Sequence, residues 1–265
     1  MRRVKPIAHE DQLTLVEHLD ELRGRVIVSI AVFGVALALC FWQNHLLLEL
    51  ASVPLPSDHD QLITFGISEP FTTTVTVAAY GAIILSLPII LYQFYAYLLP
   101  AFSKHQQRAI LPLLLLIPAL FIAGIAFGYF VVLPAATQFL LNFNDAQFNI
   151  QVRAREYYGF FAQTLIACGL VFQVPVGILA VTRLGIVKVH QLSENRRYAY
   201  LGCAVLAAAL PGIDPITMLI ETVPLLVLYE LSILLARAFG ESASPPIGEP
   251  SAQERPRNPI PPATT

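Results

Sequence analysis

The sequence predicts an all-α polytopic membrane protein: a bundle of six transmembrane helices with both termini in the cytoplasm. Hydrophobic residues make up 56% of the chain and charged residues only 13%, a composition too apolar for a soluble domain. Six largely uncharged runs each approach or exceed the roughly 20 apolar residues that cross a bilayer. Together, the composition and the runs exclude an ordinary cytoplasmic enzyme fold.

The runs also give the domain organisation. Residues 1–25 are polar and mixed in charge, and we expect a cytoplasmic amphipathic segment there. Residues 239–265 are rich in proline and poor in apolar residues, which predicts a disordered cytoplasmic tail. The transmembrane domain, 26–238, lies between them, with predicted spans at about 26–43, 73–98, 109–138, 157–182, 197–212 and 216–236.

The orientation follows from the positive charges. Every Lys and Arg except Arg153 and Arg155 falls on one side of these spans. Loops rich in Lys and Arg stay in the cytoplasm, so the pattern predicts that both termini are cytoplasmic. The loops at about 43–69 and 141–156 then face outward, and the stretch 45–50 in the first of them is amphipathic.

The segment just before the first span has the most specific pattern. On a helix, Glu21 and Arg25 are neighbours at i,i+4, while Leu19 and Leu22 belong to the opposite, apolar stripe. We expect a helix along the membrane surface, with its carboxylates just outside the lipid. A charged flank that merely anchors the first span remains an equally simple interpretation of the spacing.

Within the spans, proline, glycine and polar residues have structural meaning. Gly124 and Gly128 form a G-x-x-x-G pair that is typical of close helix contacts. Gln173 lies mid-span, where it indicates either a helix–helix hydrogen bond or a function. Glu221 and Glu230 fall on opposite faces of the last span, and interfacial solvation would also explain them. Bends are expected at the intramembrane prolines 88, 118, 134, 175 and 224.

Catalysis and small-solute transport both lack support. Every histidine lies outside the predicted spans, and there is no phosphate-binding loop, metal-ligand motif or basic run for nucleic acid. We therefore expect no enzymatic activity, cofactor, metal or nucleic-acid partner. A secondary transporter or channel would be the alternative, but its hallmark repeat symmetry and converging mid-membrane charges are missing from the sequence.

Several motifs, in order along the chain, resemble the TatC family, the polytopic subunit of the twin-arginine protein translocase. They are H-L-x-E-L-R at 18–23, S-V-P-L at 52–55, S-x-P-F at 68–71, P-I-I-L-Y-Q at 88–93, P-A-x-x-K-H at 100–105, A-F-x-Y-F-V-V-x-P at 126–134, F-x-V-P-V at 172–176, R-R-Y at 196–198 and L-Y-E at 228–230. The resemblance extends from about residue 15 to residue 239.

The resemblance implies a cup-shaped six-helix bundle without enzymatic activity. Such a protein receives cargo whose N-terminal signal carries paired arginines, and it exports that cargo folded, driven by the proton-motive force. The implied partners are the single-span subunits TatA and TatB, the signal peptides, the lipid bilayer and further copies of the chain in a receptor complex.

The resemblance also assigns candidate residues. Glu21 matches the signal-recognition glutamate, and a carboxylate there can bind a guanidinium in a forked geometry that lysine lacks. The full set of recognition candidates is Glu17, Leu19, Asp20, Glu21, Arg23, Phe94, Tyr97, Lys104, His105 and Gln106. Candidates for intramembrane polar or partner contacts are Gln173, Asp214, Thr217, Met218, Glu221 and Glu230, and structural candidates are Pro54, Pro88, Tyr129 and Pro175.

Three positions depart from the family pattern. Gln106 stands where the family usually has a second recognition glutamate, and we expect Asp20 or Glu17 to supply the missing charge. Gln173 replaces a frequent glutamate, which indicates that a carboxylate is dispensable at this position. Met218 replaces a common glutamine at the start of the last span, and we hypothesise that Thr217 and Glu221 take over its contact with a partner helix.

Overall fold

A computed structural model describes residues 15–56, 62–98, 104–144, 147–148, 150–183, 186–187, 189–211 and 214–240. This part of the chain is all-helical apart from one isolated pair of bridged residues, Ile63 and Arg153. Its helices are α1 (Leu15–Trp42), α2 (Asn44–Ser52), α3 (Glu69–Leu98), α4 (Lys104–Phe127), the π-helical turn η3 (Gly128–Val132), α5 (Leu133–Asn142), α6 (Ala154–Val171), α7 (Val174–Arg183), α8 (Val189–Glu194), α9 (Arg196–Ala209) and α10 (Pro215–Gly240). The predicted tail lies outside the described residues except at its start.

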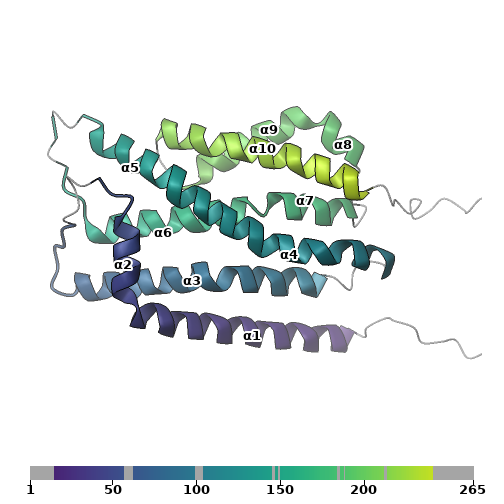
Figure 1. The fold of residues 1–265 in the computed structure, drawn as a ribbon, viewed down its shortest axis with the longest axis horizontal. Helices are drawn as coiled ribbons and strands as arrows, with labels where there is room; N and C mark the ends of the chain where they lie inside the picture. Colours follow the sequence, from purple (N-terminus) through teal and green to yellow (C-terminus); the bar gives the residue numbers. More distant parts are fainter. Residues whose placement is uncertain are drawn as a thin grey trace, which may run out of the picture.

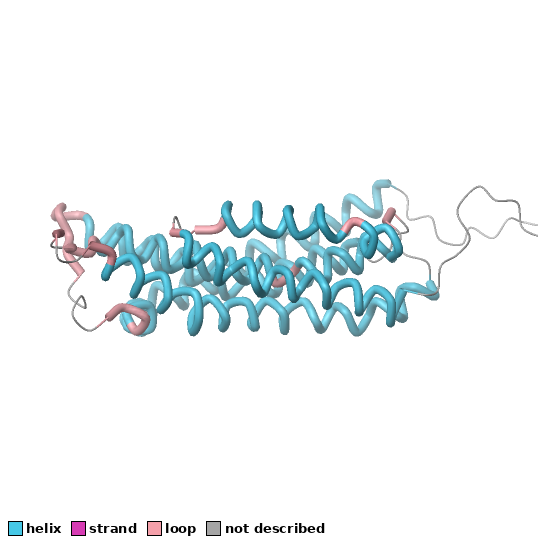
Figure 2. The backbone as a smooth tube through the Cα atoms, turned by 90° about the horizontal axis from the view of Figure 1, so that it is seen from above, coloured by secondary structure: helices cyan, strands magenta, loops and turns pink. Residues whose placement is uncertain are grey.

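The long helices run side by side along one direction, as Figures 1 and 2 show from two sides. The start of α1 and the finish of α10 lie at the same end of the bundle (Figure 1), which we call the terminal end. The opposite end, which we call the loop end, carries α2 and the connections before α3 and α6. Both ends of the transmembrane domain therefore come out on one side of the bundle.

Five helical segments are long and apolar enough to cross a membrane: His18–Trp42, Glu69–Leu98, Leu115–Asn142, Ala154–Thr182 and Pro215–Arg237. The fifth predicted span corresponds to α9, which has 14 residues. At 1.5 Å per residue it is about 21 Å long, less than the ~30 Å hydrocarbon core. The six-span count thus stays a prediction that depends on α9.

The first helix passes straight through the predicted boundary between the N-terminal segment and the first span. Leu15–Trp42 is one continuous helix, so residues 15–25 of the predicted polar segment are the first turns of α1 rather than a separate helix along the membrane surface. Small residues let α1 approach α3 closely, because Ala36 and Cys40 pack on Ala78 and Ala82. This packing joins the second half of α1 to the first half of α3, and Arg25 contacts Gln93 at the other end of the helix pair.

The G-x-x-x-G pair makes the close helix contact that the sequence predicts. A side chain added at Gly124 would lie 2.6 Å from the backbone oxygen of Cys168 on α6. At Gly128 the nearest atoms would be side-chain atoms of Leu165 and Cys168, at 3.1 to 3.3 Å. Only glycine at position 124 allows α4 and α6 to come this close.

Two of the predicted spans are interrupted. The third contains the π-helical turn η3, after which α5 begins with Pro134 in its first turn. The fourth is broken at Phe172 and Gln173, two residues before Pro175, so it consists of α6 and α7. Proline cannot donate the backbone hydrogen bond that would continue α6, and the break places Gln173 in the bundle interior.

The outer loop that the sequence predicts to be partly amphipathic contains helix α2, which is tied to the loop end by long-range hydrogen bonds. The hydroxyls of Tyr129 and Tyr157 donate to the backbone oxygens of Leu50 and Ala51, at 2.9 and 2.7 Å. Thr137 donates to the oxygen of Pro54 at 3.0 Å. These bonds satisfy carbonyls at and just beyond the end of α2, which have no partner within the helix.

Candidate functional site

The predicted i,i+4 pair at the start of α1 forms in the structure. Both Nε and Nη2 of Arg25 donate to Oε1 of Glu21, at 3.0 and 2.6 Å. Nη1 of the same guanidinium donates to the side-chain oxygen of Gln93 near the end of α3, at 2.8 Å. Arg25 therefore links the carboxylate of α1 to an amide on α3.

Aromatic rings lie beside this network. The rings of His18 and Tyr97 are stacked with centroids 4.3 Å apart, one turn from Glu21 on α1 and from Gln93 on α3. Phe94 is 55% exposed, next to Gln93. We call the group His18, Glu21, Arg25, Gln93 and Tyr97 the Glu21 cluster. It lies at the terminal end, combining a partly exposed carboxylate with flat apolar surfaces.

The remaining recognition candidates lie on the first turns of α1 and α4. Leu19 is 62% exposed, and Asp20 and Arg23 are also exposed on the first turns of α1. Lys104, His105 and Gln106 begin α4, but their side chains lie outside the described residues, as does that of Glu17. That Asp20 or Glu17 supplies the charge missing at Gln106 stays a prediction.

A second polar group lies at the start of α10. The carboxylate of Asp214 accepts the Thr217 backbone N–H at 2.7 Å, which caps the helix in front of Pro215. Asp214, Thr217 and Glu221 are all at least 96% buried, and each has an oxygen without a hydrogen-bond partner in the part of the chain that the structure describes. Glu221 is thus enclosed by the chain rather than solvated at an interface, and Met218 beside it is partly buried.

Gln173 makes the helix–helix hydrogen bond that was one of its two sequence-based interpretations. Its Nε2 donates to the backbone oxygen of Ile117 on α4 at 3.1 Å. Its Oε1 is buried and has no hydrogen-bond partner within the described ranges of the chain. An amide can supply this N–H donor, whereas an ionised carboxylate in the same place could only accept.

Glu230 faces α9, away from Glu221, as their nine-residue spacing predicts. It accepts hydrogen bonds from Arg196 at 2.9 Å and from the Tyr200 hydroxyl at 2.6 Å. The side chain is partly exposed, so the pair is an interface ion pair rather than a buried one. Within the described residues, no three His, Cys, Asp or Glu side chains are grouped as metal ligands would be.

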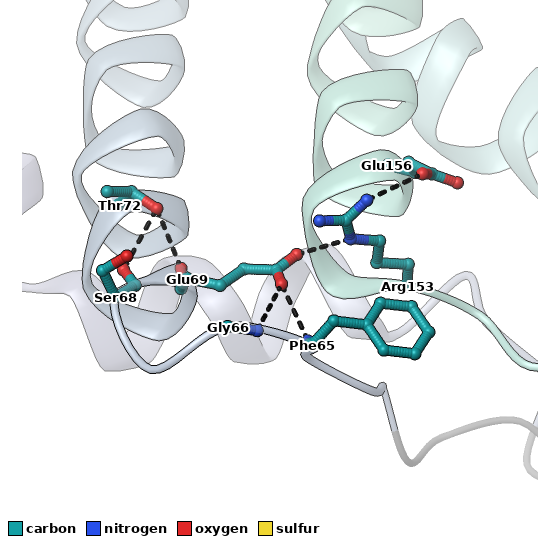
Figure 3. Close-up of polar contacts among 7 residues, drawn as sticks. All are labelled: Phe65, Gly66, Ser68, Glu69, Thr72, Arg153 and Glu156. Carbon is teal, nitrogen blue, oxygen red and sulfur yellow. Dashed lines mark hydrogen bonds and ion pairs between the residues drawn. The ribbon is translucent and has the colours of Figure 1, made fainter.

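At the loop end, Glu69 and Arg153 join segments that are far apart in the sequence (Figure 3). Nε of Arg153 donates to Oε1 of Glu69 at 2.7 Å, while the other carboxylate oxygen accepts the backbone N–H groups of Phe65 and Gly66. The Glu69 carboxylate raises the pKa of the Arg153 guanidinium further above its ordinary value, mainly through this hydrogen bond. The two outer loops are thereby fastened together.

The profile of the family described as Sec-independent protein translocase protein (TatC) matches residues 17–224 of this chain, from the first turn of α1 into α10. The chain belongs to the TatC family. The matched region contains the Glu21 cluster, Gln173 and the polar start of α10.

Relatives from distant organisms agree with this assignment. The Sec-independent protein translocase protein TatC of Deinococcus radiodurans is 34% identical over 91% of this chain and 90% of its own length. TatC of Desulforapulum autotrophicum is 33% identical over 88% and 87%. The chloroplastic TATC of Arabidopsis thaliana is 32% identical over 86% of this chain and 67% of its own.

A solved structure of a TatC protein has the same fold. The crystal structure of a twin arginine translocase receptor, TatC, superimposes with a TM-score of 0.71 at 32% identity. The match covers 84% of this chain and 99% of that structure. The all-helical TatC fold is therefore the fold of this chain.

Five residues that the structure places in these groups were not among the sequence-predicted site candidates: His18, Arg25, Glu69, Gln93 and Arg153. His18 and Gln93 belong to the quoted motifs, but only the packing of α1 on α3 shows that they flank one carboxylate. Arg153 was noticed as a charge on the outer side, and its partner Glu69 is 84 residues away. A sequence signal existed for Gln93, because a lone amide near the end of an apolar run is costly unless it has a partner.

Proposed function

We propose that this chain, a core subunit of the Tat translocase, receives the paired arginines of a cargo's signal at the Glu21 cluster. The supporting observation is the hydrogen bonding of Arg25, whose guanidinium already lies against Glu21 through Nε and Nη2. A carboxylate held in this way is suited to a further guanidinium of the same geometry. The protein then acts in export of folded cargo driven by the proton-motive force, a transport role rather than catalysis.

The surroundings of Glu21 suit a signal peptide rather than a free cation. The exposed rings of Phe94 and the stacked His18 and Tyr97 offer apolar surface next to the carboxylate. A signal peptide presents its arginines immediately before an apolar stretch. Leu19, on the first turns of α1, is also exposed and adds apolar surface near the carboxylate.

The positive-inside pattern supports an orientation in which the terminal end faces the cytoplasm. With both termini there, the Glu21 cluster meets cargo before translocation, and the loop end with Glu69 and Arg153 faces outward. We propose the cytoplasmic (inner) membrane as the location, with α9 completing six spans at a locally thin part of the bilayer.

We infer that the start of α10 meets a single-span partner, TatA or TatB. Thr217 and Glu221 have oxygens without partners among the described residues, and such groups gain from a hydrogen bond within the membrane. Because both side chains are buried, the contact requires α10 to shift or the partner's polar group to enter beside Met218. Crosslinks from position 221 to TatA or TatB would support this contact, and the absence of any would count against it.

Export in cells that lack their own TatC tests the receptor proposal. With this chain and its TatA and TatB supplied, a folded fluorescent reporter carrying a twin-arginine signal should cross the membrane. Glu21→Gln should abolish export, because the amide has no charge for the guanidinium. Glu49→Gln, the same change on the exposed face of α2 at the loop end, is the control and should export normally. Normal export by Glu21→Gln would overturn the proposal.

A further inference from the structure

A groove runs along one face of the second half of α10, next to the start of α9. Its apolar wall includes Val227, Leu231 and Leu234, of which Val227 and Leu234 are more than 60% exposed. Arg196 on α9 and Arg237 on α10 also line it, together with Glu230. Its volume is about 570 Å³. We call it the α9–α10 groove.

Arg237 puts a positive charge at the terminal end of the groove, and Arg196 lies further in, where it is bonded to Glu230. The positions from 226 to 237 on α10 span about 16 Å at 1.5 Å per residue, close to half of a ~30 Å hydrocarbon core. Arg237 lies at the terminal end of this stretch, whereas Val227 lies toward the middle of the bundle. One leaflet of lipid has the same length and the same arrangement, with a polar headgroup above an apolar chain.

Among the described residues that line the groove, Glu230 is the one acidic side chain, and its charge is already paired. Both oxygens of Glu230 are occupied, one by Arg196 and one by the Tyr200 hydroxyl. Arg237 donates from Nη2 to Ser193 at 2.7 Å, which holds its guanidinium beside α8. Each arginine has five N–H donors, so both retain donors for an anion after these contacts. The lining residues thus carry a net positive charge.

We propose that the α9–α10 groove binds an anionic phospholipid, with its phosphate between Arg196 and Arg237 and an acyl chain along Val227, Leu231 and Leu234. Basic pockets between transmembrane helices on the cytoplasmic side recognise acidic headgroups in this manner. Free phosphate would use the arginines but not the apolar wall. A zwitterionic lipid would use the wall, but its headgroup brings a cation toward the two guanidiniums.

Native mass spectrometry of the full-length protein in detergent tests this directly. The probes are phosphatidylglycerol and phosphatidylcholine with identical acyl chains, added at equal concentration. The wild type should retain phosphatidylglycerol preferentially, and Arg237→Gln should lower its affinity about fivefold, as expected for one arginine near an anionic headgroup. Arg155→Gln removes an exposed arginine at the loop end and should leave retention unchanged.

A second variant separates lipid binding from folding, because Arg237→Gln also removes the hydrogen bond to Ser193. Glu230→Gln keeps an oxygen for Arg196 and Tyr200 and removes the negative charge, so phosphatidylglycerol should bind more tightly than to the wild type. A photoactivatable phosphatidylglycerol should label residues between 226 and 237. Equal retention of both lipids by the wild type, or labelling confined to other helices, would overturn the proposal.

Discussion

Arg25 donates twice to one oxygen of Glu21, so the proposed receptor carboxylate is occupied by an arginine of its own chain. Both residues lie on α1 one turn apart, and Gln93 on α3 holds the far side of the guanidinium. The arginine of an incoming signal must share Glu21 with Arg25 or displace it. On the proposed role of Glu21, we expect the resting site to favour a guanidinium that binds this carboxylate better than Arg25 does.

Removing this internal competitor should strengthen signal binding. We expect Arg25→Gln to bind a twin-arginine peptide several-fold more tightly, since a partly exposed ion pair contributes up to about 1 kcal/mol. Fluorescence anisotropy of a labelled peptide measures the change. Arg155→Gln, which removes an exposed arginine at the loop end, serves as the control. Weaker binding to Arg25→Gln would instead show that Arg25 positions Glu21 for the cargo.

The contact between the outer loops should contribute to stability. Arg153→Gln breaks the bond to Glu69 and removes the guanidinium from the ring of Phe65, 5.4 Å away. We expect a lower midpoint of thermal unfolding in detergent and faster hydrogen exchange at Phe65 and Gly66. Glu156→Gln alters only a 3.4 Å contact of a side chain that is 74% exposed, so it should have little effect. Equal midpoints for the two variants would refute the role of Glu69.

Glycine at position 124 should be required for the packing of α4 on α6. Gly124→Ala forces a methyl group to within 2.6 Å of the Cys168 backbone oxygen, and backbone cannot move aside locally. We expect a loss of about 1–3 kcal/mol in the free energy of unfolding. Gly159→Ala on α6 meets no atom within 4 Å and should be neutral or slightly stabilising. Chemical denaturation in mixed micelles compares them, and an undisturbed Gly124→Ala would contradict the close contact.

The buried amide of Gln173 should matter through one hydrogen bond. Gln173→Leu has a similar volume but loses the donor to Ile117, and we expect it to lower the free energy of unfolding by about 1 kcal/mol. Gln163→Leu makes the same change at an exposed position of α6 and should stay within about 0.5 kcal/mol of the wild type. If both variants unfold alike, the bond does not stabilise the bundle.

The sequence predicted those features that depend on the helical spacing and the size of nearby residues. The pair Glu21 and Arg25 and the contact at Gly124 follow from helical periodicity and residue size, so both could be stated beforehand. The break before Pro175 follows from the missing backbone donor of proline, although its place at Phe172 and Gln173 did not.

Contacts between distant segments could not be predicted in this way. Gln93 is 68 residues from Arg25, and Glu69 is 84 residues from Arg153, so no periodicity relates them. The burial of Glu221 depends on how α10 packs against its neighbours, whereas its position near a span end suggested solvation. Helix α8 has only six residues and no apolar periodicity to indicate it.

Binding of a labelled twin-arginine signal peptide, against its twin-lysine counterpart, tests the receptor role of Glu21 most directly. The purified wild type should prefer arginine, and Glu21→Gln should bind both peptides equally and weakly, because the forked charge-assisted contact is lost. Gln106→Glu should strengthen the preference by restoring a second carboxylate. If the wild type does not distinguish the peptides even with TatB present, or if Glu21→Gln keeps the preference, the Glu21 cluster is not the receptor site.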